Sequence, residues 1–218
     1  MVNMAIVDLI FRRVMLLFLT GAVLSLVLID QNKLKIKTLN TTLPSVSDLK
    51  EFVYHPAQMD QGKMRDVFTY YKFECDYMGA NTYEKPAACG IVGYAYYYLG
   101  DRPKSIEYLS QAAKLFGHSF WTYYDLGVIY YNEEHYTQAM DCFALAKEAY
   151  PYTIRFFLAT MTYRQMAGLL GLGPQDFEQG LEQGGEHVRQ LYLVSKLFLE
   201  NPDFKKQFAK KTIDLRLF

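Results

Sequence analysis

The sequence predicts an all-α protein in which helical hairpins stack into a solenoid, preceded by a single transmembrane helix. The first observation is a pattern of residues that recurs after 34 positions. The recurring positions pair Gly93 with Gly127, Tyr96 with Tyr130, Ala112 with Ala146 and Leu109 with Phe143. The second observation is an uncharged apolar run near the N-terminus. The third is a hydrophobic content of 51% over 218 residues, which suits one globular core and a tail.

The N-terminal element is the apolar run at residues 14–29, which we expect to cross a membrane. A bilayer core needs about 20 helical residues, and the run is slightly shorter. Two apolar residues before it complete the span if Arg12 and Arg13 extend towards the headgroups. The predicted anchor therefore occupies residues 1–30, with residues 9–29 in contact with the membrane.

Two alternatives to an anchor are a cleaved signal peptide and a helix buried in a soluble domain. No A-x-A cleavage pattern ends the run, and its apolar residues are not patterned like those of a buried helix, so we favour the anchor. Lys and Arg flank both ends and define no clear orientation. Because only a short tail precedes the run, we expect the repeats in the periplasm at a bacterial inner membrane. A cytosol-facing organellar receptor requires the opposite topology.

The segment at residues 31–60 is polar and is expected to form a linker and a short helix, with Ser47 as its cap and Pro56 after its end. Residues 61–77 are predicted to form a longer helix that begins a helical domain at residues 61–218. Its expected apolar face contains Met64, Val67, Phe68, Tyr71 and Cys75.

Two clear repeats follow, at residues 86–119 and 120–153. The second repeat carries Tyr123, Leu126, Gly127, Tyr130, Ala139, Phe143, Ala146 and Pro151. These positions match the tetratricopeptide pattern W-x2-L-G-x2-Y and its second-helix residues, with Tyr in place of Trp. The first repeat keeps Gly93, Tyr96, Gly100 and Ala112. The chain therefore resembles tetratricopeptide repeat proteins, and this resemblance implies helical hairpins that hold other proteins.

Gly93 and Gly127 are expected where the two helices of each hairpin cross closely. Two repeats are fewer than the roughly three needed for a stable stack, so we expect degenerate helices on both sides. Beyond the second repeat, the predicted elements are a helix at residues 153–170, a glycine-rich loop at 168–185 with a short helix at 175–181, a helix at 187–199 and a basic capping helix at 204–218. For the last of these, contact with a membrane surface is the alternative.

In tetratricopeptide proteins the first helices of successive repeats line a concave face. The resemblance therefore implies an aromatic groove that binds a partner segment, since Tyr and Trp contribute strongly to interfaces. The residues expected in this groove are Tyr94, Tyr97, Tyr98, Trp121, Tyr124, Tyr131, Asn132 and Arg155. Tyr96 and Tyr130 are expected to pack between helices instead.

Other classes of function lack support in the sequence. The formal net charge of zero gives no basis for nucleic-acid binding. Scattered histidines and the lack of catalytic motifs lead us to expect no enzyme activity, no metal, no cofactor and no small-molecule substrate. The cysteines Cys75, Cys89 and Cys142 lack metal-site spacing. In an oxidising compartment Cys75 and Cys89 could form a disulfide, which the sequence leaves open.

We therefore expect a membrane-anchored scaffold or accessory subunit that binds another protein and supports assembly of a membrane-associated complex. The alternative is an integral structural subunit of a larger, energy-converting membrane complex, held there by its transmembrane helix. Deleting residues 1–30 separates the two, because a scaffold should be released as a folded soluble domain and a structural subunit should become unstable.

Overall fold

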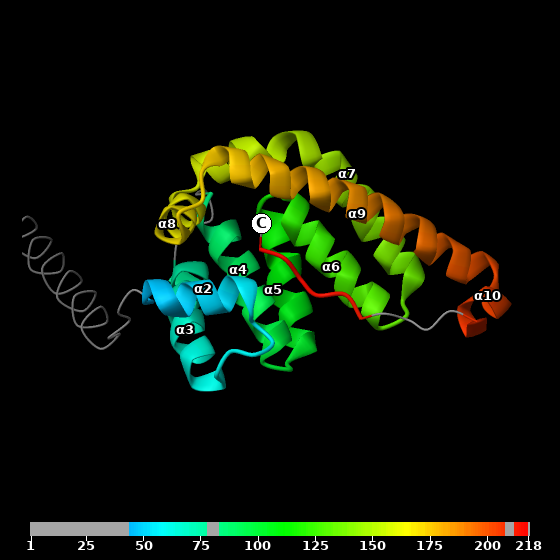
Figure 1. The fold of residues 1–218 in the computed structure, drawn as a ribbon, viewed down its shortest axis with the longest axis horizontal. Coiled ribbons are helices and arrows are strands. Elements are labelled where there is room, and N and C mark those ends of the chain that lie inside the picture. The colour runs from blue at the N-terminus through cyan, green and yellow to red at the C-terminus, as the bar shows by residue number, and fades with distance from the viewer. Residues whose placement is uncertain (1–43, 78–82, 208–211, 218) are drawn as a thin grey trace, which may run out of the picture. The chain divides into compact units, whose positions relative to one another are not determined.

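A computed structural model describes residues 44–77, 83–207 and 212–217. These residues contain helices and no strand (Figure 1). The helices are α2 (Val46–Tyr54), α3 (Gln61–Tyr77), α4 (Glu84–Tyr98), α5 (Arg102–Leu115), α6 (Phe120–Asn132), α7 (Tyr136–Ala159), α8 (Met161–Leu170), α9 (Pro174–Glu200) and α10 (Pro202–Gln207). The predicted anchor at residues 1–30 lies outside the described residues. No helix within the described ranges has the length and apolar character that a membrane span requires.

The two predicted repeats form the hairpins α4–α5 and α6–α7, whose helices pack along their length. A Cβ atom at Gly93 would lie 2.6 Å from Cγ of Leu109, and one at Gly127 would lie 2.5 Å from Cε1 of Phe143. Real Cβ atoms do not approach neighbours so closely, which explains glycine at both crossings. The close helix crossing expected at Gly93 and at Gly127 is confirmed.

The first helix of each hairpin ends in the same backbone motif. Gly100 has φ of 83° and Glu134, 34 positions later, has φ of 67°. At each end two successive N–H groups donate to carbonyls of the last helical turn, over 2.8–3.0 Å. This is the Schellman arrangement, in which the left-handed residue is usually glycine. In the second hairpin, Glu134 therefore adopts a left-handed backbone conformation that favours a residue without a side chain.

The predicted helix at residues 61–77 has the same bounds as α3, and four of its five predicted face residues are buried. The disulfide Cys75–Cys89 joins α3 to α4, with the Cα atoms 4.8 Å apart. Both half-cystines are fully buried. This result resolves the pairing that the sequence left open.

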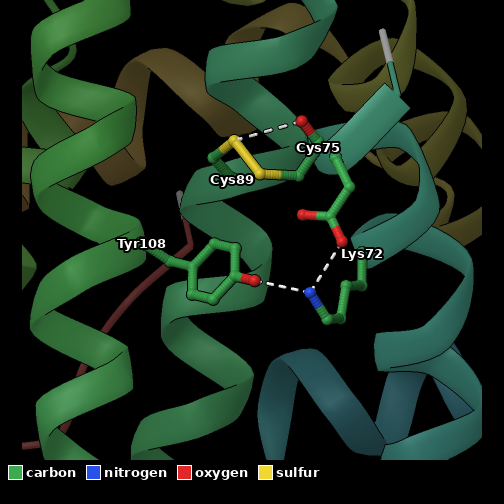
Figure 2. Close-up of a disulfide and its surroundings, with 5 residues drawn as sticks. Lys72, Cys75, Cys89 and Tyr108 are labelled. Atoms are coloured by element: carbon green, nitrogen blue, oxygen red, sulfur yellow. Dashed lines mark hydrogen bonds and ion pairs between the residues drawn. A yellow bond between two sulfur atoms is a disulfide. The ribbon is translucent and has the colours of Figure 1, made fainter.

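A lysine connects the same region to the first hairpin (Figure 2). Lys72 of α3 donates to the hydroxyl of Tyr108 on α5 over 2.5 Å and to Asp76 over 2.7 Å. Burial opposes the charge on Lys72, but the hydrogen bonds to Asp76 and Tyr108 outweigh it, so the pKa of Lys72 is raised. The disulfide and this lysine therefore hold α3 against both helices of the first hairpin.

The chain after the second repeat differs from the prediction. A new helix was expected at residues 153–170, but α7 continues through Pro151 to Ala159, and α8 begins at Met161. The continued turns bury Phe156 and Phe157. Burial of two Phe side chains contributes about 3–6 kcal/mol, which offsets the roughly 3 kcal/mol that a proline costs inside a helix.

The predicted glycine-rich loop at residues 168–185 is wrong as well, because α9 runs without a break from Pro174 to Glu200. A Cβ atom at Gly184 would lie 2.7 Å from Cη2 of Trp121 on α6. The glycine therefore permits a close helix crossing and does not mark a loop. The predicted end of this helix before Pro202 is confirmed, with Asn201 as its C-terminal cap.

The predicted capping helix at residues 204–218 is also wrong. The short α10 ends at Gln207, and residues 212–217 belong to no helix. This last segment, drawn in red in Figure 1, runs alongside α6.

Candidate binding groove

The first helices of the two hairpins, α4 and α6, share a face that already holds a peptide segment of this chain. We call this face the groove and define it by Tyr97, Tyr98, Asp125 and Asn132. Residues 212–217, which we call the tail, lie along it and bond to three of these four side chains. The face at which the resemblance placed a partner-binding groove is therefore covered by a segment of the chain itself.

Asn132 binds the tail backbone with both ends of its amide. Its Nδ2 donates to the carbonyl of Ile213 over 2.7 Å, and its Oδ1 accepts from the N–H of Ile213 over 3.1 Å. The same Nδ2 donates to the hydroxyl of Tyr97 over 3.0 Å. Because these hydrogen bonds involve only main-chain atoms of the tail, Asn132 can bind an extended segment whatever the side chain of the bound residue.

Two further side chains bind the backbone of the next residues. The N–H of Leu215 donates to the hydroxyl of Tyr98 over 3.1 Å, and this hydroxyl donates to the Leu215 carbonyl over 3.5 Å. The N–H of Arg216 donates to Oδ1 of Asp125 over 2.9 Å. Asp125, Tyr98 and Asn132 therefore form a row of polar groups that follows the tail.

Asp125 is a carboxyl group in an apolar setting, with 2% of its surface exposed. Burial raises the pKa of Asp125 well above its ordinary range, while the N–H and the charge of Arg216 oppose that shift. The hydrogen bond from the tail is thus the main compensation for placing this carboxyl inside the protein.

The tail directs alternate side chains into the protein. Leu215 and Leu217 are 4% and 5% exposed, and Ile213 is half-buried. The intervening side chains of Thr212, Asp214 and Arg216 are exposed. The two leucines help to line a pocket of about 300 Å³, together with Val53 of α2, Phe157 of α7 and Phe177 of α9.

The conformational entropy of the tail opposes these contacts. Burying two leucines and part of an isoleucine contributes about 4–8 kcal/mol, and the hydrogen bonds add about 3–7 kcal/mol. Ordering the tail costs about 6–12 kcal/mol in conformational entropy. The favourable and the unfavourable contributions to tail docking are therefore of the same order.

The structure brings together three of the eight predicted groove residues, namely Tyr97, Tyr98 and Asn132. Arg155 lies apart from them: it is exposed on α7 and, within the described chain, makes no hydrogen bond or ion pair with the other seven. The α7 extension explains this position, because the third repeat that was expected to carry Arg155 does not begin there.

The remaining four predicted residues, Tyr94, Trp121, Tyr124 and Tyr131, are at most 5% exposed. The expectation that they line an open face needs correction, because neighbouring helices cover them. In α2, Phe52 packs on Tyr94 with ring centroids 5.3 Å apart. In α9, Gly184, His187 and Phe198 cover the other three. These aromatic side chains support the groove from beneath.

Sequence reasoning missed Asp125 and the tail, although both left a signal. Asp125 is the only acidic residue of α6, a helix that is otherwise mostly apolar or aromatic. In the tail, the order Ile213, Asp214, Leu215, Arg216, Leu217 alternates apolar and charged residues, which is typical of an extended segment with one buried side. The predicted capping helix at residues 204–218 does not account for this alternation.

Other kinds of site find no counterpart in the described part of the chain. It contains no cluster of three or more His, Cys, Asp or Glu side chains placed to hold a metal ion. The thiol of Cys142 is half-buried, and burial raises its pKa to about 12. A thiol with such a pKa is a poor nucleophile at neutral pH.

Comparison with known families supports the assignment of the second hairpin. Residues 122–153 match the tetratricopeptide repeat model. A search of curated proteins gives no match. The matched repeat and the all-α structure together support a tetratricopeptide-type helical protein, for which protein–protein interaction or a scaffold role is the general expectation.

Proposed function

We propose that this protein is a membrane-anchored scaffold, or an accessory subunit, that binds a segment of another protein in the α4–α6 groove. In doing so it supports assembly of a membrane-associated complex. The single observation that carries this proposal is the row formed by Tyr98, Asp125 and Asn132, which binds an extended backbone in the structure itself. A groove that holds one extended segment through main-chain atoms suits other segments of similar shape.

The location is part of the same proposal. The apolar run at residues 14–29 supports an anchor, and the Cys75–Cys89 disulfide supports an oxidising compartment such as the bacterial periplasm. An anchor would raise the effective concentration of a membrane-associated partner near the groove.

The test is native purification of the full chain in mild detergent, followed by mass spectrometry of the proteins that co-purify. For the wild type we expect one or a few membrane proteins at reproducible amounts. In Asn132→Ala, which loses both main-chain bonds, recovery of the partner should fall.

Arg155→Ala is the matched control, because Arg155 was predicted in the groove and lies outside it. Its partner recovery should equal that of the wild type. Equal losses in both variants, or none in either, would count against binding through the groove. If Asn132→Ala leaves a set of partners unchanged at fixed stoichiometry, the result would favour an integral structural subunit held by its transmembrane helix.

A further inference from the structure

We propose that the tail is a built-in competitor for the groove, and that the partner segment displacing it is extended and carries aliphatic side chains at three alternate positions. The inference deepens the proposed function, on which it rests, by naming the chemistry of the ligand and the state of the free protein. It follows from the contacts of residues 212–217 and from the apolar pocket beside them.

Competition follows because tail and ligand would need the same atoms. Both amide atoms of Asn132 are engaged by Ile213, and the hydroxyl of Tyr98 is engaged by Leu215. Oδ1 of Asp125 accepts from the N–H of Arg216. A second extended backbone therefore cannot bond to this row until the tail has left it.

The side-chain preference follows from which tail residues face inward. Leu215 and Leu217 adjoin Val53 of α2, Phe157 of α7 and Phe177 of α9, and Ile213 is half-buried, whereas Asp214 and Arg216 are exposed. An extended ligand repeats this spacing because its side chains alternate with a period of two. A helical ligand would present a period near 3.6 and could not satisfy the row in the same way.

The pocket beside the leucines shows why a partner could displace the tail. Leu215 and Leu217 leave about 300 Å³ of space between themselves and the walls formed by Val53, Phe157 and Phe177. A partner whose aliphatic side chains reach further into this space would bury more apolar surface than the tail does. Better filling of this space would favour the partner over the internal competitor.

The experiment uses the full chain and a synthetic peptide with the tail sequence Thr-Ile-Asp-Leu-Arg-Leu-Phe. Isothermal titration calorimetry measures peptide binding to the wild type and to Ile213→Ser/Leu215→Ser, which loosens the internal tail. A tail that occupies the groove in nine of ten molecules weakens the apparent affinity about tenfold. We therefore expect the double variant to bind the peptide at least about tenfold more tightly than the wild type.

The matched control is Thr212→Ser/Asp214→Ser, which changes two exposed tail residues to the same new side chain. It should bind the peptide as weakly as the wild type. Adding Asn132→Ala to the loosened chain should weaken peptide binding about tenfold. A peptide with Ser in place of its Ile and of its first Leu should bind neither chain.

Equal peptide affinity of the wild type and of the loosened chain would overturn the competition. A wild-type dimer that becomes monomeric in the loosened chain would also overturn it, because the tail would then bind the groove of a neighbouring molecule. Circular dichroism confirms that each variant is folded before titration. These measurements need no natural partner. A failure of the proposed function in the co-purification would thus be distinguishable from a failure of the competition.

Discussion

At the scale of single residues, the two hairpin ends form a natural comparison. Gly100 and Glu134 occupy equivalent positions with positive φ, and only one of them is glycine. Glu134 also forms an ion pair with Lys205, whose side chain is partly exposed. Surface pairs contribute little, about 0–1 kcal/mol, whereas a non-glycine residue in the left-handed region costs about 1–2 kcal/mol.

We therefore expect Glu134→Gly to raise the free energy of unfolding by up to about 1 kcal/mol, and Gly100→Ala to lower it by about 1 kcal/mol. Urea denaturation followed by circular dichroism measures both. A destabilised Glu134→Gly protein would show that the contacts of Glu134 outweigh the backbone strain.

Asp125, which binds the tail, should make the stability of the protein depend on pH. Because burial raises its pKa, the stabilisation associated with the protonated carboxyl is complete below the ordinary pKa of about 4. It is lost as the pH rises through the raised value. Asp125→Asn keeps an oxygen for the N–H of Arg216 and removes the ionisation.

The variant's advantage in free energy of unfolding over the wild type should therefore grow from about pH 4 towards pH 8. It should reach about 1.4 kcal/mol for each unit by which the pKa is raised. Denaturation curves across this range give the difference. Parallel stability profiles for the two proteins would contradict a raised pKa.

At the scale of helices and hairpins, the close approach of the two helices at Gly127 can be tested directly. Gly127→Ala would force Phe143 to move and should cost about 1–3 kcal/mol. Gly168→Ala is the control, since a Cβ atom added at Gly168 of α8 would meet nothing within 4 Å and alanine is the better helix former. It should stabilise the protein by about 0.5–1 kcal/mol. Thermal unfolding of both variants checks the pair, and similar effects would refute a close crossing at Gly127.

The hairpins were predictable because their signals are local. Gly127 and Phe143 lie within one repeat, and a known period links them to Gly93 and Leu109. The path of α9 was not predictable in this way. Its Gly184 resembles a loop residue in the sequence, and only the distant Trp121 explains why a helix needs a glycine there.

The course of the tail was less predictable still. Its alternating pattern is short, and basic residues before it also fit an amphipathic helix. The outcome depends on Asn132 and Asp125, which are about 80–90 positions away in the chain. Of the candidate site, the polar residues Tyr97, Tyr98 and Asn132 followed from the repeat register. The burial of Tyr124 did not follow, because it requires α9.

At the scale of the whole molecule, the disulfide joins the degenerate N-terminal helices to the first hairpin. It closes a loop between Cys75 and Cys89, which are 14 residues apart, and should contribute about 3 kcal/mol. Replacing both cysteines with serine should lower the stability by that amount. The same change at Cys142 should have a much smaller effect.

Thiol titration in denaturant should find one reactive cysteine per chain before reduction and three after it. Protein taken directly from cells into an alkylating agent tests the proposed compartment. Three free thiols in such a sample would contradict an oxidising location. The anchor, the periplasmic location and the domain boundary at residue 61 stay predictions.

The chain contains a single tryptophan, Trp121, and it lies where α9 crosses α6. With 4% of its surface exposed and Phe120 and Tyr124 around it, the indole is shielded from water by both helices. Its emission therefore originates from one known contact and should be blue-shifted while α9 is docked. The protein thus carries an intrinsic optical probe, with which a stopped-flow trace would resolve the closing of α9 on the repeats without any added label.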